Sequence, residues 1–96
     1  MAVLAASQFT LKFGEGSADR VGFYAVNNAT TGDTFDVAGV FSRVKLTAFV
    51  CITAQGASTG AVAGTVITVP TGYANDSAWV TVWGDAGPTK VVDALG

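Results

Sequence analysis

The sequence contains no histidine and a single cysteine, Cys51. Without histidine, a Ser-His-Asp triad, a Cys-His dyad and the common His-based zinc sites cannot form. One cysteine cannot make an internal disulfide bond. Cys51 stands in an apolar stretch, where a thiol behaves as a small hydrophobic group, so we predict a packing role for it. We expect no enzymatic activity and no cofactor or metal ion.

Charged residues are also scarce, at 12% of the 96 residues, while half of the chain is apolar and the mean hydropathy is +0.47. The net charge is −2 and only five residues are basic, which argues against nucleic acid or an anionic membrane as partner. So little charge on a small domain indicates that a partner covers part of its surface. Alternatively, Ala, Gly, Thr and Ser provide a neutral surface that water wets.

Long apolar runs are missing too. No stretch approaches the roughly 18 residues of a membrane span, and the first residues lack the basic region and apolar core of a secretory signal. We therefore expect synthesis in the cytoplasm. A chain of this length forms one small core with a low free energy of unfolding, and association with neighbours is the commonest way to stabilise such a domain.

Alternation of apolar and polar residues is present throughout, and no window carries a helical apolar stripe. Turn signals separate the alternating segments, and the connections are too short for crossover helices. These features predict a single all-β domain, an antiparallel sandwich or small barrel of about seven short strands. The expected strands are 8–13, 20–27, 34–37, 44–53, 61–69 and 78–84, with a short terminal strand or arm at 89–95.

With histidine absent, two pairs of aspartates are the remaining candidates for acid–base chemistry or Ca²⁺ binding. Asp33 and Asp36 are spaced by three, and Asp76 and Asp85 lie at expected strand ends. Neither pair has the density of acidic ligands that a dedicated calcium loop has. We therefore interpret all four as residues that cap turns.

Trp79 and Trp83 are spaced by four on one expected strand, which places both indoles on the same face. Such a pair could form a stacking platform for sugars, with Thr81 and Asp85 as flanking polar groups. The competing interpretation is that one tryptophan packs in the core and the other lies at a subunit contact.

Several short signatures between residues 20 and 84 resemble those of small β-rich structural proteins of bacteriophage virions, including capsid decoration or cement proteins. They are Gly32-Asp33-Thr34-Phe35-Asp36, Phe41-Ser42-Arg43-Val44-Lys45, Gly64-Thr65, Pro70-Thr71-Gly72 and Trp83-Gly84.

This resemblance implies a jelly-roll-like sandwich, often a homotrimer, that binds the major capsid protein on the exterior of the capsid. Such proteins commonly extend a terminus onto a neighbour, so we expect residues 1–7 to be an extended arm and 8–96 the sandwich. Alternative functions are a phage tail or fibre component and a carbohydrate-binding module. The expected interface residues are Met1, Ala2, Val3, Leu4, Arg43, Lys45 and Trp83.

Overall fold

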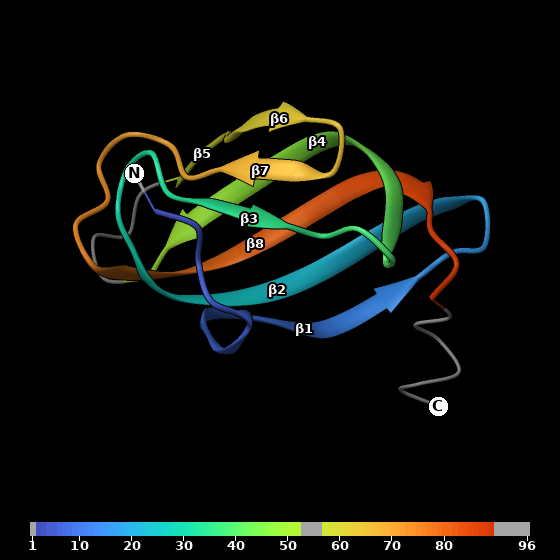
Figure 1. Ribbon diagram of the computed structural model, residues 1–96, viewed down its shortest axis with the longest axis horizontal. Helices are drawn as coiled ribbons and strands as arrows, with labels where there is room; N and C mark the ends of the chain where they lie inside the picture. The colour runs from blue at the N-terminus through green and yellow to red at the C-terminus, as the bar shows by residue number, and fades with distance from the viewer. Residues whose placement is uncertain (1, 53–56, 90–96) are drawn as a thin grey trace.

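The computed structural model describes residues 2–52 and 57–89, which form a single all-β domain (Figure 1). Within these ranges the only helix is a 3₁₀ turn, and none is long and apolar enough to cross a membrane. The elements are η1 (Ala6–Gln8), β1 (Phe9–Glu15), β2 (Asp19–Ala29), β3 (Thr34–Asp36), β4 (Phe41–Cys51), β5 (Ala57–Ser58), β6 (Ala61–Ala63), β7 (Val66–Thr68) and β8 (Asp76–Ala86).

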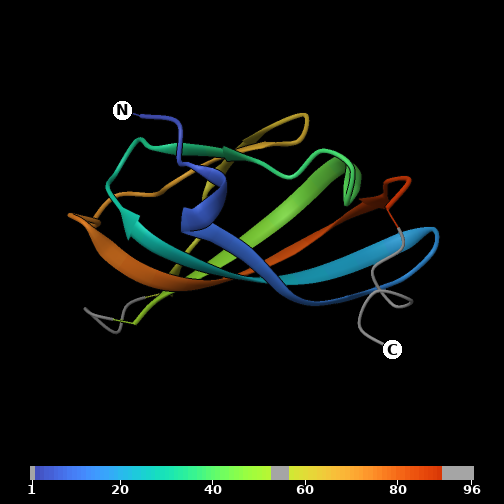
Figure 2. The same ribbon diagram turned by 60° about the horizontal axis from the view of Figure 1, so that its bottom comes forward.

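The strands form two antiparallel sheets, which confirms the predicted sandwich. The larger sheet has the order β1-β2-β8-β4-β5 and the smaller sheet the order β3-β7-β6. Figure 2 shows the smaller sheet lying over one face of the larger one. The smaller sheet covers one face of the larger sheet, and no element of residues 2–52 and 57–89 forms a layer over the other face.

The core lies between the two sheets and is centred on Phe35 of β3. Its ring lies 6.2 Å from that of Phe49 in β4, edge to face, and 6.3 Å from that of Tyr24 in β2. Offset and edge-on aromatic pairs of this kind add to the stabilisation that burial alone provides. Cys51 is buried in the same core, as predicted. The other buried apolar residues are Leu4, Val26, Ala29, Val37, Phe41, Val44, Ile67, Val69, Tyr73, Ala78, Val80 and Val82.

Two details of the expected strands are wrong. Segment 61–69 is a hairpin of β6 and β7, because Gly64 adopts a φ of +65° and reverses the chain. In β1 the register shifts between Leu11 and Phe13, so Phe13 lies on the outer face instead of sharing a face with Phe9 and Leu11. The expected terminal strand at 89–95 lies almost wholly outside the described residues.

Two tyrosines, Tyr24 and Tyr73, are buried in the core, and the hydroxyl group of Tyr24 has no hydrogen-bond partner among the described residues. Burial raises the pKa of Tyr24, and it raises the pKa of Tyr73 to about 12, with nearby Cys51 and Asp76 adding to the second shift. A pKa raised above its unfolded value near 10 means that the neutral form is favoured in the fold. The contribution of the neutral tyrosines to the free energy of unfolding is therefore complete below pH 10, and it declines as the pH rises from 10 through 12.

We therefore expect the domain to unfold at alkaline pH, with tyrosinate absorbance and loss of the circular-dichroism signal appearing together. Tyr24→Phe should move this transition to higher pH, and at pH 7 it should leave stability unchanged or raise it by up to about 1 kcal/mol, because an unpaired buried hydroxyl is removed. A marked loss of stability in Tyr24→Phe at pH 7 would show that the hydroxyl has a partner.

Candidate functional site: an uncovered aromatic face

The outer face of the larger sheet carries an unusual number of large apolar side chains. We call this surface the aromatic face; its side chains come from β1, β2, β4 and β8 and from the residue that follows β4. They are between 39% and 52% exposed. The seven residues are Phe13, Phe23, Leu46, Val50, Ile52, Trp79 and Trp83.

Strand register brings these side chains together. Across β8, Trp83 pairs with Val21 of β2 and Leu46 of β4, and Trp79 pairs with Ala25 and Val50 in the same way. Beside them, the rings of Phe13 and Phe23 are 5.8 Å apart. Cross-strand neighbours on one face stand only about 5 Å apart at the Cβ atoms, so the members form one continuous surface.

Both tryptophans belong to this face, as their spacing predicts. The competing interpretation, in which one of them packs in the core, is wrong, because Trp79 is 49% and Trp83 39% exposed. The core positions of β8 are instead the alternate residues, such as Val80 and Val82.

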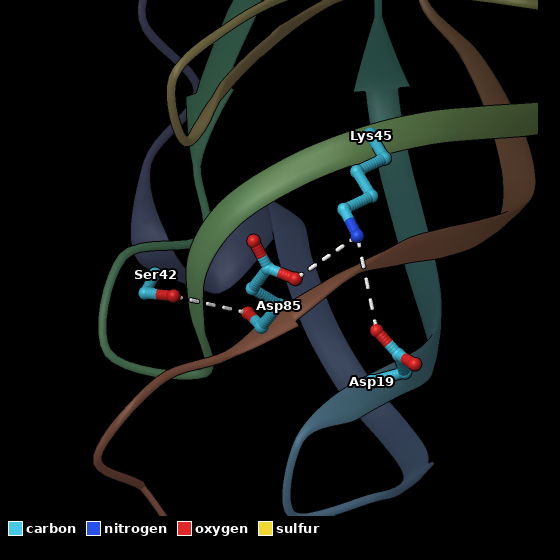
Figure 3. Close-up of polar contacts among 4 residues, drawn as sticks. All are labelled: Asp19, Ser42, Lys45 and Asp85. Carbon is cyan, nitrogen blue, oxygen red and sulfur yellow. Dashed lines mark hydrogen bonds and ion pairs between the residues drawn. The ribbon is translucent and has the colours of Figure 1, made fainter.

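A shallow hollow of about 650 Å³ adjoins the face at one end of the sheet. Trp83 and Val21 provide its apolar lining, and its charged residues are Glu15, Asp19, Arg20 and Lys45. Lys45 reaches across β8: its Nζ lies 3.1 Å from Asp85 Oδ1 and 3.8 Å from Asp19 Oδ1 (Figure 3). Because these groups are well exposed, the pairs contribute little to stability, but they fix the position of the ammonium group over the sheet.

The structure brings together three of the expected interface residues. Lys45 and Trp83 both line the hollow, and exposed Arg43 pairs across the strands with Asp85, whose carboxylate also contacts Lys45. The register of β4 against β8 shifts between Phe41 and Arg43 and again between Val44 and Leu46, so Arg43 directly follows the first irregularity and Lys45 lies within the second. Such bulges redirect side chains, which explains how both basic residues reach the same end of the outer face.

The expected amino-terminal interface lies elsewhere, beside β3. Val3 forms a parallel bridge with Thr34, the amide of Leu4 donates to the carbonyl of Thr34 at 2.8 Å, and the amide of Thr34 donates to the carbonyl of Ala2 at 2.9 Å. Leu4 is buried in the core, whereas Val3 is 80% exposed. The described part of the expected arm therefore pairs with its own chain, and Leu4 is not available to a partner; Met1 lies outside the described residues.

Asp33, Asp36 and Asp76 accept hydrogen bonds from nearby backbone amides within turns, as interpreted from the sequence, whereas Asp85 lies inside β8 and pairs with Lys45, so the turn-capping interpretation is wrong for it. Asp33 accepts hydrogen bonds from the amides of Ala2 and Thr30, both at 2.9 Å, and the bonds from Thr30 and then Ala2 are the main causes that lower its pKa. Asp36 accepts from the amide of Ala38. Asp76 and Asp85 lie nine residues apart in β8, about 30 Å along an extended strand, so they form no pair. No cluster of metal-binding side chains occurs in residues 2–52 and 57–89.

Arg20 has a structural role that sequence reasoning missed. It is only 6% exposed, and its guanidinium donates to the carbonyl of Gly16 at 2.8 Å, to that of Val40 at 2.6 Å and to that of Thr89. Arg20 thus joins three segments that are distant in the sequence. No sequence motif indicates this role, because all three hydrogen-bond acceptors are backbone carbonyls, which every residue has.

No protein-family model matches this chain, and neither the curated proteins nor the solved structures contain a significant match to it.

Proposed function

We propose that this protein is a structural protein of a bacteriophage virion, a decoration or cement protein that binds the major capsid protein on the capsid exterior after synthesis in the host cytoplasm. The uncovered aromatic face is the observation that carries the proposal. A protein that works within an assembly has this face shielded by a neighbour, whereas a free monomer exposes it to water. Low charge and the lack of histidine agree with a role in assembly instead of catalysis.

The charged end of the outer face supports a specific mode of docking. Arg43 and Lys45 stand there beside Asp19 and Asp85, so the surface offers hydrogen-bonding groups of both signs next to the Trp83 indole. Charged groups at the rim of an interface orient the partner and make binding sensitive to salt. We assign contact with the shell to Arg43 and Lys45, which stand at the edge of the aromatic face.

Particles assembled without this chain provide the test. The purified protein is expected to bind them in a sedimentation assay, and the double variant Arg43→Ser/Lys45→Ser is expected to bind at least about tenfold more weakly, which corresponds to a loss of about 0.7 kcal/mol for each of the two contacts. Lys12→Ser is the matched control, because Lys12 is an exposed basic residue of edge strand β1 that does not line the hollow. Equal binding by the double variant would contradict the assigned contact, and no binding by the unaltered protein would contradict the function.

A phage tail or fibre component is the nearest alternative, and copy number separates the two. Quantitative mass spectrometry of purified particles is expected to count this chain at a ratio to the major capsid protein near one or a simple fraction of one. A few copies per particle would place the protein in the tail instead.

The hollow beside Trp83 favours a second candidate function, carbohydrate binding. An indole next to carboxylate and ammonium groups provides both a stacking surface and hydrogen-bond partners for a sugar ring. This function predicts binding on a glycan array that Trp83→Ala abolishes and Trp79→Ala, outside the hollow, leaves in place. Absence of binding to any glycan would contradict it.

A further inference from the structure

We propose that the aromatic face packs against the same face of a second copy of this chain, related to the first by a two-fold axis. The inference deepens the proposed function by naming a sister subunit as the occupant of this face. The shell contact through Arg43 and Lys45 lies at its charged end.

The size of the face fits a stable dimer. A whole aromatic side chain presents about 200 Å² and an aliphatic one about 150 Å², so the exposed fractions of the seven members correspond to roughly 550 Å² per copy. That is about a tenth of the 5125 Å² surface, before the smaller residues between them are counted. Two such faces approach the roughly 1,200 Å² at which specific protein interfaces begin, and interfaces typically take about a tenth of a small protein's surface.

The charge of the face suits a copy of itself. The residues that strand pairing places between the large members are neutral, namely Val21, Ala25, Ala48 and Thr81. Ionic groups stand at its end, where Lys45 contacts Asp85 and Asp19. Two faces can therefore meet without removing an unpaired charge from water, which is the costliest event at an interface.

Geometry selects two copies instead of three. A two-fold contact needs only one patch, since the same surface serves both subunits, whereas a ring of three joins two different patches on each subunit. The outer face of the larger sheet is one continuous patch. Two such sheet faces can stack about 10 Å apart, as the two sheets of a sandwich do. A dimer therefore replaces the trimer that the phage resemblance implies.

Both tryptophans of the chain lie on this face, which makes them reporters of its burial. Sedimentation equilibrium is expected to give twice the 9.7 kDa mass of one chain, and dilution through the dissociation constant should shift tryptophan emission to longer wavelength and increase acrylamide quenching. A monomer at every concentration, a threefold mass, or a dimer with freely quenched tryptophans would overturn the inference.

Three variants locate the contact. Trp79→Ser and Val50→Lys, both at positions about half exposed, are each expected to weaken dimerisation at least tenfold, the first by removing an aromatic anchor and the second by placing an unpaired charge on the face. Val3→Ser is the control, because Val3 is exposed but lies beside β3. Thermal unfolding checks that every variant folds. Unchanged dimerisation in both face variants would overturn the inference.

The virion function and the dimer can be contradicted independently of each other. A monomer that still sediments with particles would overturn the dimer and leave the virion function standing. A dimer that binds no particle would overturn the virion function and leave the dimer standing.

Discussion

Replacing Leu4 with alanine is expected to lower the free energy of unfolding by about 2–5 kcal/mol, the range for truncating a buried leucine. The side chain is 5% exposed and belongs to the core between the sheets. A loss of this size is a large fraction of the 5–15 kcal/mol that stabilises a typical domain. Guanidinium chloride unfolding followed by far-ultraviolet circular dichroism measures it.

The neighbouring residue provides the control. Val3→Ala should change stability by less than about 0.5 kcal/mol, because its side chain is 80% exposed. Similar losses in the two variants would show that the amino-terminal segment does not pack as described. Because Leu4 is buried, deleting the whole amino-terminal segment cannot test whether that segment contacts a partner. Deleting residues 2–7 would remove Leu4 from the core and the hydrogen bonds to Thr34, so lost particle binding would report unfolding as well as contact.

Replacing Arg20 with methionine is expected to cost about 2–4 kcal/mol. Methionine fills a similar volume but donates no hydrogen bond, so the carbonyls of Gly16, Val40 and Thr89 lose their charged donor. Each bond to a charged group contributes about 1.5–3 kcal/mol, and relief from burying the guanidinium offsets part of the loss. The same denaturant measurement tests this expectation.

Arg43→Met is the matched control, since Arg43 is exposed, and it should change stability by less than about 0.5 kcal/mol. Arg20→Lys should recover only part of the lost stability, because one ammonium group cannot reproduce the fork of donors that a guanidinium offers. An unaffected Arg20→Met protein would mean that water satisfies the three carbonyls.

Much of the candidate site follows from the sequence. The spacing of Trp79 and Trp83 is sufficient to place both indoles on one face of a strand, and the structure keeps them there. Arg43, Lys45 and Trp83 were expected at an interface, and they meet at one end of the outer face. Ala2, Val3 and Leu4 do not join them, because they pair with β3, and this pairing involves a strand more than 25 residues away in the chain that no local sequence pattern indicates.

The sequence by itself determined the all-β class, the approximate strands and, apart from the irregularity in β1, the sets of residues that share a face, because a period of two is a local property of an extended chain. It could not determine which set faces inward. Leu46 and Val50 of β4 and Ile52 just after it face outward, while Thr47, Phe49 and Cys51 of β4 are buried. Only the tertiary structure decided this, since burial depends on which face the smaller sheet covers, and that sheet is built from residues distant in the sequence.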